Sequence, residues 1–265
     1  MRSLVTGIKL FVSSICLVCF LFAWGVLAAA PDEITVSAAA SLKNAFEDIG
    51  KLFEAQNKGI KVFYNFGASG DLKRQIEGGA PVDVFASAAL REMDDLERQG
   101  SLVAGTRRNF AANGMVLARP SASNIQLKSF DDLTRHEVKR VAIGNPPSVP
   151  AGMYAEQVLK YFGVWEGIKN KLVFGESVRQ VLDYVARGEV DAGIVFSTDV
   201  LVRSKDVTIV IKAPEGSHMA VVYPIAVVKN AKNEQVARAF VDFVMSDNAR
   251  RVLEKYGFKG SVASK

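Results

Sequence analysis

The sequence predicts an α/β fold, in which strands and helices alternate along the chain. Short apolar runs such as 34–38 and 141–144 have the length of buried strands. Segments with an apolar residue at every third or fourth position, such as 41–56, follow them and indicate amphipathic helices. This alternation predicts mostly parallel sheets. The 265 residues suffice for one large or two small domains.

The expected elements follow one another in a regular order. Glycines close two of the early helices, at Gly78 and Gly100, and Pro120 ends one strand. The expected strands are 34–38, 59–66, 82–86, 115–118, 141–144, 172–174, 192–196, 207–211 and 221–228. The expected helices are 41–56, 70–78, 90–100, 151–162, 177–187, 236–244 and 249–256.

The first 28 residues have the pattern of a secretory signal peptide. Arg2 and Lys9 precede an apolar run from Leu10 to Leu27, and small residues follow it. Cleavage is expected near Ala28, so we expect an exported, periplasmic protein with 1–28 removed. The run is also long enough to act as an uncleaved membrane anchor.

The positions of the cysteines and the distribution of charge exclude further classes of protein. Cys16 and Cys19 both lie in the apolar run, so the mature chain is expected to have no disulfide. The formal net charge of the whole chain is only +5. Lys and Arg are scattered rather than clustered, which argues against binding of nucleic acid.

Four expected helix starts carry small or hydroxyl residues. A helix start leaves its first N–H groups unpaired and carries a partial positive charge, so it can bind an oxyanion. Ordinary N-capping by the serines is the alternative interpretation, and Ser177 with Gln180 fits a capping box. The four junctions are Ala38–Leu42, Phe66–Gly70, Val149–Gly152 and Glu176–Arg179.

The motifs of common enzymes are missing from the sequence. Only His136 and His218 could serve a catalytic serine, and each lies in a polar or turn-like stretch. Asp71 stands where a Gly-x-Ser-x-Gly elbow would need its last glycine. There is no cysteine or histidine pattern for a metal and no phosphate-binding loop. We therefore expect a protein that is not an enzyme.

Taken together, six motifs resemble the periplasmic molybdate-binding proteins of ABC transporters. The resemblance runs from about residue 33 to Phe258 and so covers nearly the whole mature chain. The motifs are Ala38–Leu42, Phe66–Ser69, Gly79–Ala88, Val149–Gly152, Glu176–Arg179 and Asp191–Asp199.

This resemblance implies a type II periplasmic binding-protein fold, with two α/β lobes and a ligand cleft between them. The first lobe would comprise 31–113 and 219–265, and the second 114–218. Such a protein, expected to be a monomer, would bind molybdate or tungstate without a cofactor and deliver it to an inner-membrane permease. Molybdenum would be bound only as its oxyanion, with no direct metal ligand.

The resemblance also implies which residues bind the ligand. Ser41 and Ser69 would donate hydroxyl and backbone N–H groups, and Ala151 and Val178 would donate backbone N–H groups. Phe196 stands where many members carry a tyrosine whose hydroxyl contacts the oxyanion, and phenylalanine cannot donate. Ser197 or Thr198 could supply the missing donor.

Two other functions stay open at this point. The ligand could be a different small oxyanion, such as sulfate or thiosulfate. An exported α/β hydrolase is the other alternative, and it would require a histidine beside Ser41 or Ser69.

Overall fold

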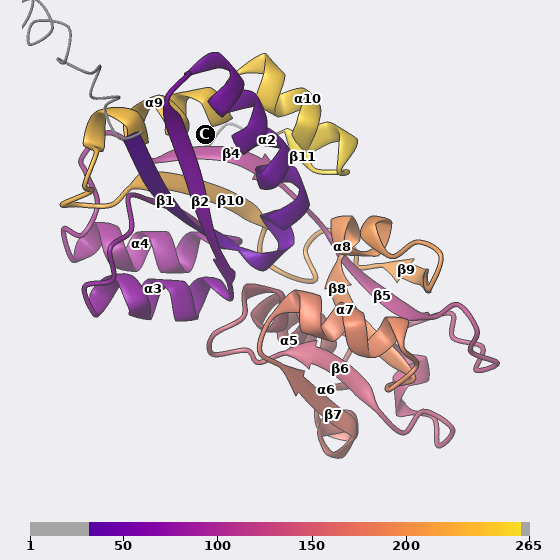
Figure 1. Ribbon diagram of the computed structural model, residues 1–265. Coiled ribbons are helices and arrows are strands. Elements are labelled where there is room, and N and C mark those ends of the chain that lie inside the picture. Colours follow the sequence, from indigo (N-terminus) through magenta and orange to yellow (C-terminus); the bar gives the residue numbers. More distant parts are fainter. Residues whose placement is uncertain (1–31, 261–265) are drawn as a thin grey trace, which may run out of the picture. The chain divides into compact units, whose positions relative to one another are not determined.

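The computed structural model describes residues 32–260 (Figure 1). The expected signal peptide and its cleavage site at Ala28 lie outside these residues. Within the described range, no helix combines the length and the apolar character needed to cross a membrane. Two sheets, each covered by helices, make up this part of the chain, so the predicted α/β class is confirmed.

The first lobe is built on a six-stranded sheet of order β11-β4-β10-β3-β1-β2. Figure 1 shows α3 and α4 on one side of this sheet and α2, α9 and α10 on the other. Its strands are β1 (Asp32–Ala39), β2 (Ile60–Gly67), β3 (Val84–Ala86), β4 (Arg108–Ala112), β10 (Val222–Val227) and β11 (Lys259–Gly260). Its helices are the 3₁₀ turn η1 (Ala40–Leu42), α2 (Lys43–Gln56), α3 (Ser69–Glu77), α4 (Leu90–Arg98), α9 (Glu234–Val244) and α10 (Asp247–Lys255).

The second lobe is built on a five-stranded sheet of order β7-β6-β8-β5-β9. Its strands are β5 (Met115–Pro120), β6 (Val141–Gly144), β7 (Leu172–Gly175), β8 (Ala192–Phe196) and β9 (Val207–Lys212). Its helices are η2 (Asp131–Thr134), α5 (Pro150–Tyr161), α6 (Trp165–Ile168), η3 (Lys169–Lys171), α7 (Val178–Ala186) and α8 (Ser197–Val202). The domain boundaries predicted at 113/114 and 218/219 fall between strands of different sheets and stay a prediction.

The expectation of mostly parallel sheets is wrong, because both sheets are mixed. β1 pairs in parallel with β2 and β3, and β6 pairs in parallel with β7 and β8. By contrast, β10 runs antiparallel to β3 and β4, and β5 runs antiparallel to β8 and β9. β5 and β10 enter their sheets from the other lobe, so no strand–helix–strand crossover forces them to be parallel.

The sequence pattern does not predict several of the short elements. Strand β4 and helices α6 and α8 were not expected, and α8 lies directly after β8 without a loop. The helix expected at 41–56 is in fact divided, since η1 precedes α2. Short elements carry too few residues for a periodic pattern to be recognised.

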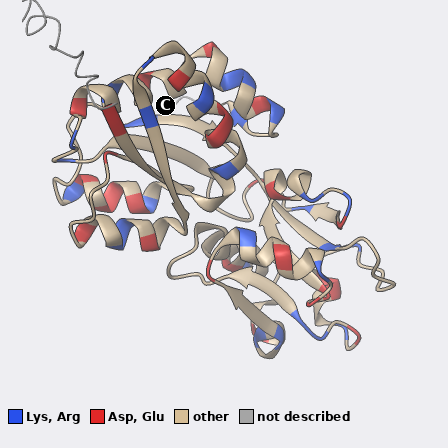
Figure 2. Cartoon of the chain, viewed as in Figure 1, with Lys and Arg blue, Asp and Glu red and all other residues tan. Residues whose placement is uncertain are grey.

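Alternation along β3 shows how the first sheet buries both faces. Phe85 packs with Leu72 and Met93 under α3 and α4. Its neighbours Val84 and Ala86 belong to the main core on the other face. There the ring of Phe53 packs against two phenylalanine rings of helix α9. Successive side chains of a strand point to opposite faces, so both layers of helices find apolar surface there. On the helices, acidic and basic residues are interspersed (Figure 2).

Candidate functional site

A small cavity lies where the helix starts of the two lobes meet. Its volume is about 10 Å³, room for a single water-sized group and far less than the space typical of drug-sized ligands. Among the described residues that line it, none carries a charged side chain. The lining residues are Ala39, Ala40, Ser41, Gly67, Ala68, Ser69, Ala88, Val149, Pro150, Ala151, Val178 and Phe196. All five residues selected from the sequence are among them, and their binding of a ligand stays a prediction.

The first lobe contributes two buried serines. Ser41 lies in the 3₁₀ turn η1, and Ser69 is the first residue of α3. Neither caps a helix, since η1 and α3 have alanines at their N-caps. The Ser69 Oγ instead accepts a 3.0 Å hydrogen bond from the N–H of Ala88, which leaves its own proton free to donate.

The capping interpretation is therefore wrong for Ser41 and Ser69 but confirmed for Ser177. The Ser177 Oγ accepts from the N–H of Gln180 at 3.2 Å. The Gln180 Oε1 accepts from the N–H of Glu176, one residue before the N–H that a capping box would use, so only the Ser177 half of the predicted capping box is formed.

The second lobe contributes backbone N–H groups. Pro150 occupies the first position of α5 and has no N–H, so the N–H of Ala151 is the first that this helix offers. Val178 is the first residue of α7, directly after the cap Ser177, so its N–H is the first that this helix offers. Neither N–H has an acceptor within residues 32–260. Helix α5 packs closely against the end of strand β6. A side chain at Gly152 would not fit there, because its Cβ would lie only 2.0 Å from the carbonyl oxygen of Gly144.

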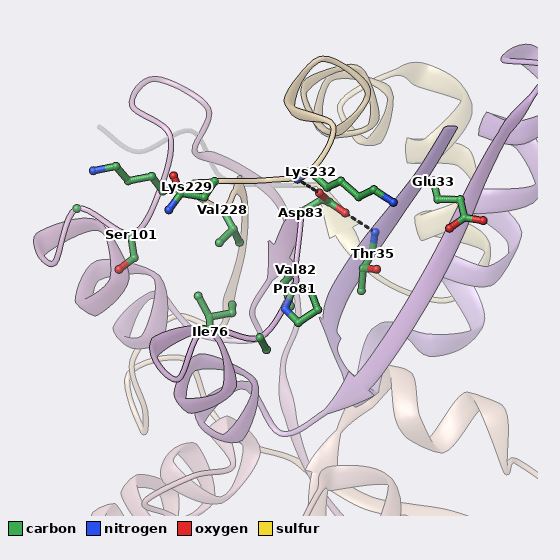
Figure 3. Close-up of a pocket in the computed structure, with 14 residues that line it drawn as sticks. Glu33, Thr35, Ile76, Pro81, Val82, Asp83, Ser101, Val228, Lys229 and Lys232 are labelled. Carbon is green, nitrogen blue, oxygen red and sulfur yellow. Dashed lines mark hydrogen bonds between the residues drawn. The ribbon is translucent and has the colours of Figure 1, made fainter. Parts of the chain in front are cut away.

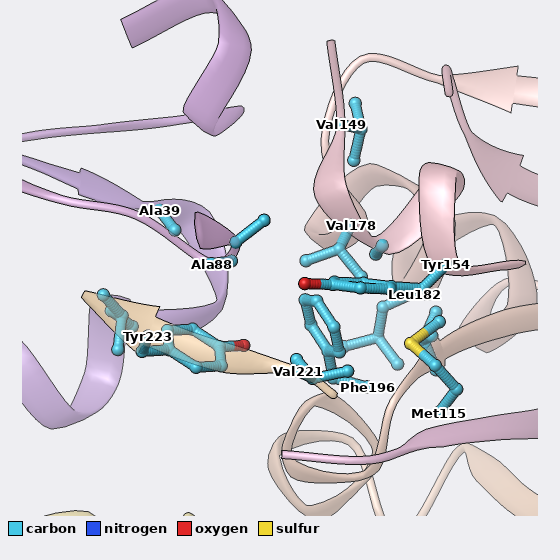
Figure 4. Close-up of a cluster of buried hydrophobic side chains, with 14 of the residues drawn as sticks. Ala39, Ala88, Met115, Val149, Tyr154, Val178, Leu182, Phe196, Val221 and Tyr223 are labelled. Carbon is cyan, nitrogen blue, oxygen red and sulfur yellow. The ribbon is translucent and has the colours of Figure 1, made fainter. Parts of the chain in front are cut away.

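Phe196 ends β8 and brings an aromatic ring to the cavity. The side chain is buried, with its ring centroid 6.3 Å from that of Tyr154 and 5.9 Å from that of Tyr223. Figure 4 shows the three rings together, with the hydroxyl of Tyr223 reaching in from the first lobe. The ring therefore shapes the cavity without adding a donor.

The two residues proposed to replace the missing hydroxyl are engaged elsewhere. Ser197 donates to the Oδ1 of Asn113 at 2.9 Å, and the Oγ1 of Thr198 accepts from the Nδ2 of Asn113 at the same distance. Neither lines the cavity. Asn113 therefore holds the start of α8, and the orientation of its amide follows from the Gly114 N–H that donates to Oδ1.

A chain of hydrogen bonds leads from Asn113 to Ser41. The Asn113 Nδ2 donates to the hydroxyl of Tyr223 at 3.2 Å, and that hydroxyl lies 3.1 Å from the Oγ of Ser41. Burial raises the pKa of Tyr223, so its hydroxyl stays protonated and can donate. If Tyr223 donates to Ser41, the proton of Ser41 is directed to a further acceptor. Sequence reasoning missed Asn113 and Tyr223, because 182 positions separate Tyr223 from Ser41 and neither belongs to a motif.

Behind Val178, a buried ion pair was also missed. The Nε of Arg179 lies 2.8 Å from the Oδ1 of Asp199, although the N–H does not point at the oxygen as in a well-formed hydrogen bond. Asp199 is completely buried, and this burial raises the pKa of its carboxyl to about 6 even though Arg179 acts in the opposite direction. Asp199 could have drawn notice in the sequence only as an acidic residue that follows a strongly apolar strand.

Backbone contacts hold the two lobes against each other beside the cavity. The N–H of Gly70 donates to the carbonyl oxygen of Ser148 at 3.0 Å. The guanidinium of Arg91 donates to the carbonyl oxygen of Pro147 at 3.2 Å. These contacts give the described part of the chain a closed cleft.

A larger hollow in the first lobe has a different character (Figure 3). Its volume is about 600 Å³, and it shares no lining residue with the small cavity. Its buried carboxylate, Asp83, accepts hydrogen bonds from the N–H groups of Thr35 and Lys232 at 2.7 and 2.6 Å. Asp83 therefore serves to tie β1 to the start of α9.

Catalytic and metal-binding clusters are missing from the part of the chain described here. His136 is exposed beside Glu137, and His218 packs its ring against Tyr154, with no hydrogen bond from either to Ser41 or Ser69. No group of three histidine, cysteine or acidic side chains within 32–260 could hold a metal ion.

Comparisons with known proteins agree with this architecture. The profile of a family described as bacterial extracellular solute-binding protein matches residues 34–259. The molybdate-binding protein ModA of Escherichia coli (strain K12) is 40% identical over 230 residues, covering 85% of this chain and 88% of that protein. ModA of Mycobacterium tuberculosis (strain H37Rv) is 39% identical over 226 residues, covering 85% and 84%. The solved periplasmic molybdate-binding protein of Azotobacter vinelandii is similar in fold, with a TM-score of 0.76 at 24% identity over 88% of this chain and 100% of that chain.

Proposed function

The chain belongs to the family of bacterial extracellular solute-binding proteins, and we propose that it captures molybdate or tungstate in the small interlobe cavity. Members of this family are transport proteins rather than enzymes, and they carry no cofactor. The predicted type II periplasmic binding-protein fold is confirmed by the two mixed α/β sheets and the similarity to a solved member. High identity to proteins named for molybdate favours this ligand.

The observation that carries the proposal is a small cavity whose described lining is uncharged and to which both lobes contribute residues that can donate hydrogen bonds. A buried dianion is costly unless hydrogen-bond donors surround it. The hydroxyl groups of Ser41 and Ser69 and the N–H groups of Ala151 and Val178 line the cavity from both lobes. A hydrogen bond to a charged partner contributes about 1.5–3 kcal/mol, so four or more such bonds support tight binding.

The same set of donors favours a fully deprotonated ion. The Oγ of Ser69 already accepts from Ala88, and that of Ser41 lies within hydrogen-bond distance of Tyr223. Among residues 32–260, no carboxylate lines the cavity to accept a proton from a protonated phosphate, which would leave a buried donor unpaired. Sulfate has shorter bonds than molybdate or tungstate, so it would fail to reach all donors of a rigid ring.

Delivery to an inner-membrane ABC permease follows from family membership. The expected signal peptide, with cleavage near Ala28, would place the mature monomer in the periplasm. A closed cleft would present the loaded protein to the permease, and opening there would release the ion.

Calorimetric titration of the mature protein with molybdate, tungstate, sulfate, thiosulfate and phosphate tests the proposal. Molybdate and tungstate should bind at least about 100-fold more tightly than sulfate, a difference of about 2.8 kcal/mol. Equal or tighter binding of sulfate or thiosulfate would assign the cavity to that oxyanion instead. Hydrolysis of ester substrates that is lost in Ser41→Ala or Ser69→Ala would favour the hydrolase alternative.

A further inference from the structure

One side chain of the second lobe, Arg179, reaches across the cleft to the first lobe. Its Nη1 donates to the Oδ1 of Asn44 at 2.9 Å, and its Nη2 donates to the backbone carbonyl oxygen of Ser41 at 3.2 Å. Its Nε lies beside Asp199 of its own lobe. The guanidinium of Arg179 therefore contacts both lobes at the same time.

The position of Arg179 in the chain connects it to both halves of the cavity. It follows Val178 directly, so the helix start that offers the Val178 N–H also carries the guanidinium. Its first-lobe partner, Ser41, is the residue whose hydroxyl lines the cavity. A hydrogen bond to the Ser41 carbonyl therefore fixes the distance between a donor of one lobe and a donor of the other.

Asp199 keeps the guanidinium in place for this contact. It is completely buried near the start of α8, three residues after Phe196. Its carboxylate forms an ion pair with the guanidinium of Arg179. A planar guanidinium that is held on one edge by a carboxylate presents its other N–H groups in a fixed direction. The pair costs desolvation energy wherever it forms, so its value to the protein is expected to be orientation rather than stability.

We propose that Arg179 is a positioning residue that locks the two lobes together over the bound ion and so sets how long the ion stays. The contacts to Asn44 and Ser41 can exist only when the cleft is closed, whereas the Asp199 pair belongs to one lobe and persists on opening. Arg179 therefore stabilises the closed state, so its loss is expected to change dissociation of the ion more than its association. The effect on residence time rests on the proposed function, but the effect on lobe closure does not.

Three variants separate the lock from general stability. Asn44→Ala removes one of the two first-lobe acceptors of Arg179 and leaves the buried ion pair intact. Arg179→Met with Asp199→Asn removes both charges together, so no buried charge is left without its partner. Arg187→Met is the matched control, because Arg187 lies at the end of the same helix, is mostly exposed and pairs only with Glu189 within its own lobe.

Stopped-flow measurement of molybdate binding gives the first readout. The double variant should release molybdate at least about tenfold faster and Asn44→Ala about threefold faster, with association rates changed less than about twofold. Arg187→Met should match the wild type in both rates. Slower association with unchanged dissociation in the double variant would overturn the proposal.

Spin-label distances across the cleft, measured without any ligand, give the second readout. Asn44→Ala and the double variant should shift the distribution towards open lobes relative to wild type and Arg187→Met. Distributions identical to that of the control would overturn the lock. If the wild type binds no molybdate, the proposed function fails, and this ligand-free comparison still decides the role of Arg179.

Discussion

The backbone N–H of Gly70 donates to the carbonyl oxygen of Ser148 at 3.0 Å, so the main chains of the two lobes touch one residue beyond Ser69. A Cβ on Gly70 would lie 2.7 Å from that oxygen and 2.9 Å from the Ser148 Cα, closer than such atoms pack. Both of these close atoms belong to the backbone of Ser148, so they cannot move aside as the end of a flexible side chain could. A residue without a side chain is therefore required at Gly70 for the cleft to close.

Gly70→Ala should separate binding from stability. Alanine favours the helix by up to about 1 kcal/mol over glycine, so the unliganded protein should melt at the same or a higher temperature. Molybdate affinity should fall at least about tenfold, or about 1.4 kcal/mol, because closure is obstructed. Calorimetry and thermal unfolding measure the two effects. Gly167→Ala in α6 is the control, since its Cβ would meet only ordinary contact at 3.8 Å. Unchanged affinity in Gly70→Ala would show that the cavity works without this contact.

Replacing either cavity serine should weaken binding directly. Ser41→Ala and Ser69→Ala each remove one hydroxyl donor, for an expected loss of about 1.5–3 kcal/mol of molybdate binding. Ser246→Ala is the control, because Ser246 caps α10 by accepting from the N–H of Ala249. That variant should lose about 1 kcal/mol of stability and bind normally. Cavity variants that melt early but bind normally would contradict their role as ligands.

Tyr223→Phe tests the hydrogen-bond chain behind Ser41. Loss of the Tyr223 hydroxyl leaves Ser41 without its partner, so molybdate binding should weaken by about 0.5–1.5 kcal/mol. Tyr64→Phe is a matched control, since the Tyr64 hydroxyl donates to the Phe46 carbonyl oxygen at 2.6 Å and lies outside the cavity. Equal binding losses in the two variants would mean that Tyr223 acts only through stability.

Phe196→Tyr adds the hydroxyl that the resemblance to molybdate-binding proteins leads us to expect at this position. The ring lines the cavity, so the added donor should tighten molybdate binding by about 1 kcal/mol, or several-fold, with unchanged melting of the unliganded protein. Calorimetry and thermal unfolding check both statements. A clear fall in the unliganded melting temperature would mean that the hydroxyl is buried among Tyr154 and Tyr223 without a partner.

The pH dependence of stability should reveal Asp199. Burial raises the pKa of its carboxyl from an ordinary 3.8 to about 6 in the folded protein. The folded state therefore holds a proton that the unfolded state has lost between these pH values. The contribution of Asp199 to the free energy of unfolding is therefore greatest below about pH 4. It falls by up to about 3 kcal/mol as the pH rises through 6. The guanidinium of Arg179 acts in the opposite direction on the pKa of Asp199, and the Asp199 charge in turn helps to raise the pKa of Tyr223.

Urea unfolding of wild type and Asp199→Asn between pH 4 and pH 7 measures this contribution. The free energy of unfolding of the wild type, relative to the variant, should fall as the pH rises. A constant difference would show that Asp199 titrates near its ordinary pKa. Carboxyls with lowered pKa, such as Asp48 and Asp95, titrate below this window and are present in both proteins.

The resemblance to molybdate-binding proteins implied the individual site residues. The sequence by itself determined the α/β class, most of the elements and the four helix-start junctions. Local pattern decides these features, because a buried strand needs an apolar run and an amphipathic helix needs a period of 3.6. The helix starts at Ala151 and Val178 could be found in this way, since their signal lies within a few residues. Short elements such as β4 and α8 carried no such signal.

Only the tertiary structure decided how these junctions work together. Both sheets are mixed rather than mostly parallel, because β5 and β10 each follow a segment that crosses from the other lobe. The structure also shows that Ser41 and Ser69 have no capping role. The partners of Ser41 are Tyr223 and Arg179, which stand 182 and 138 positions away along the chain. Contacts of this kind depend on how two lobes meet in space, and no local pattern of residues records them.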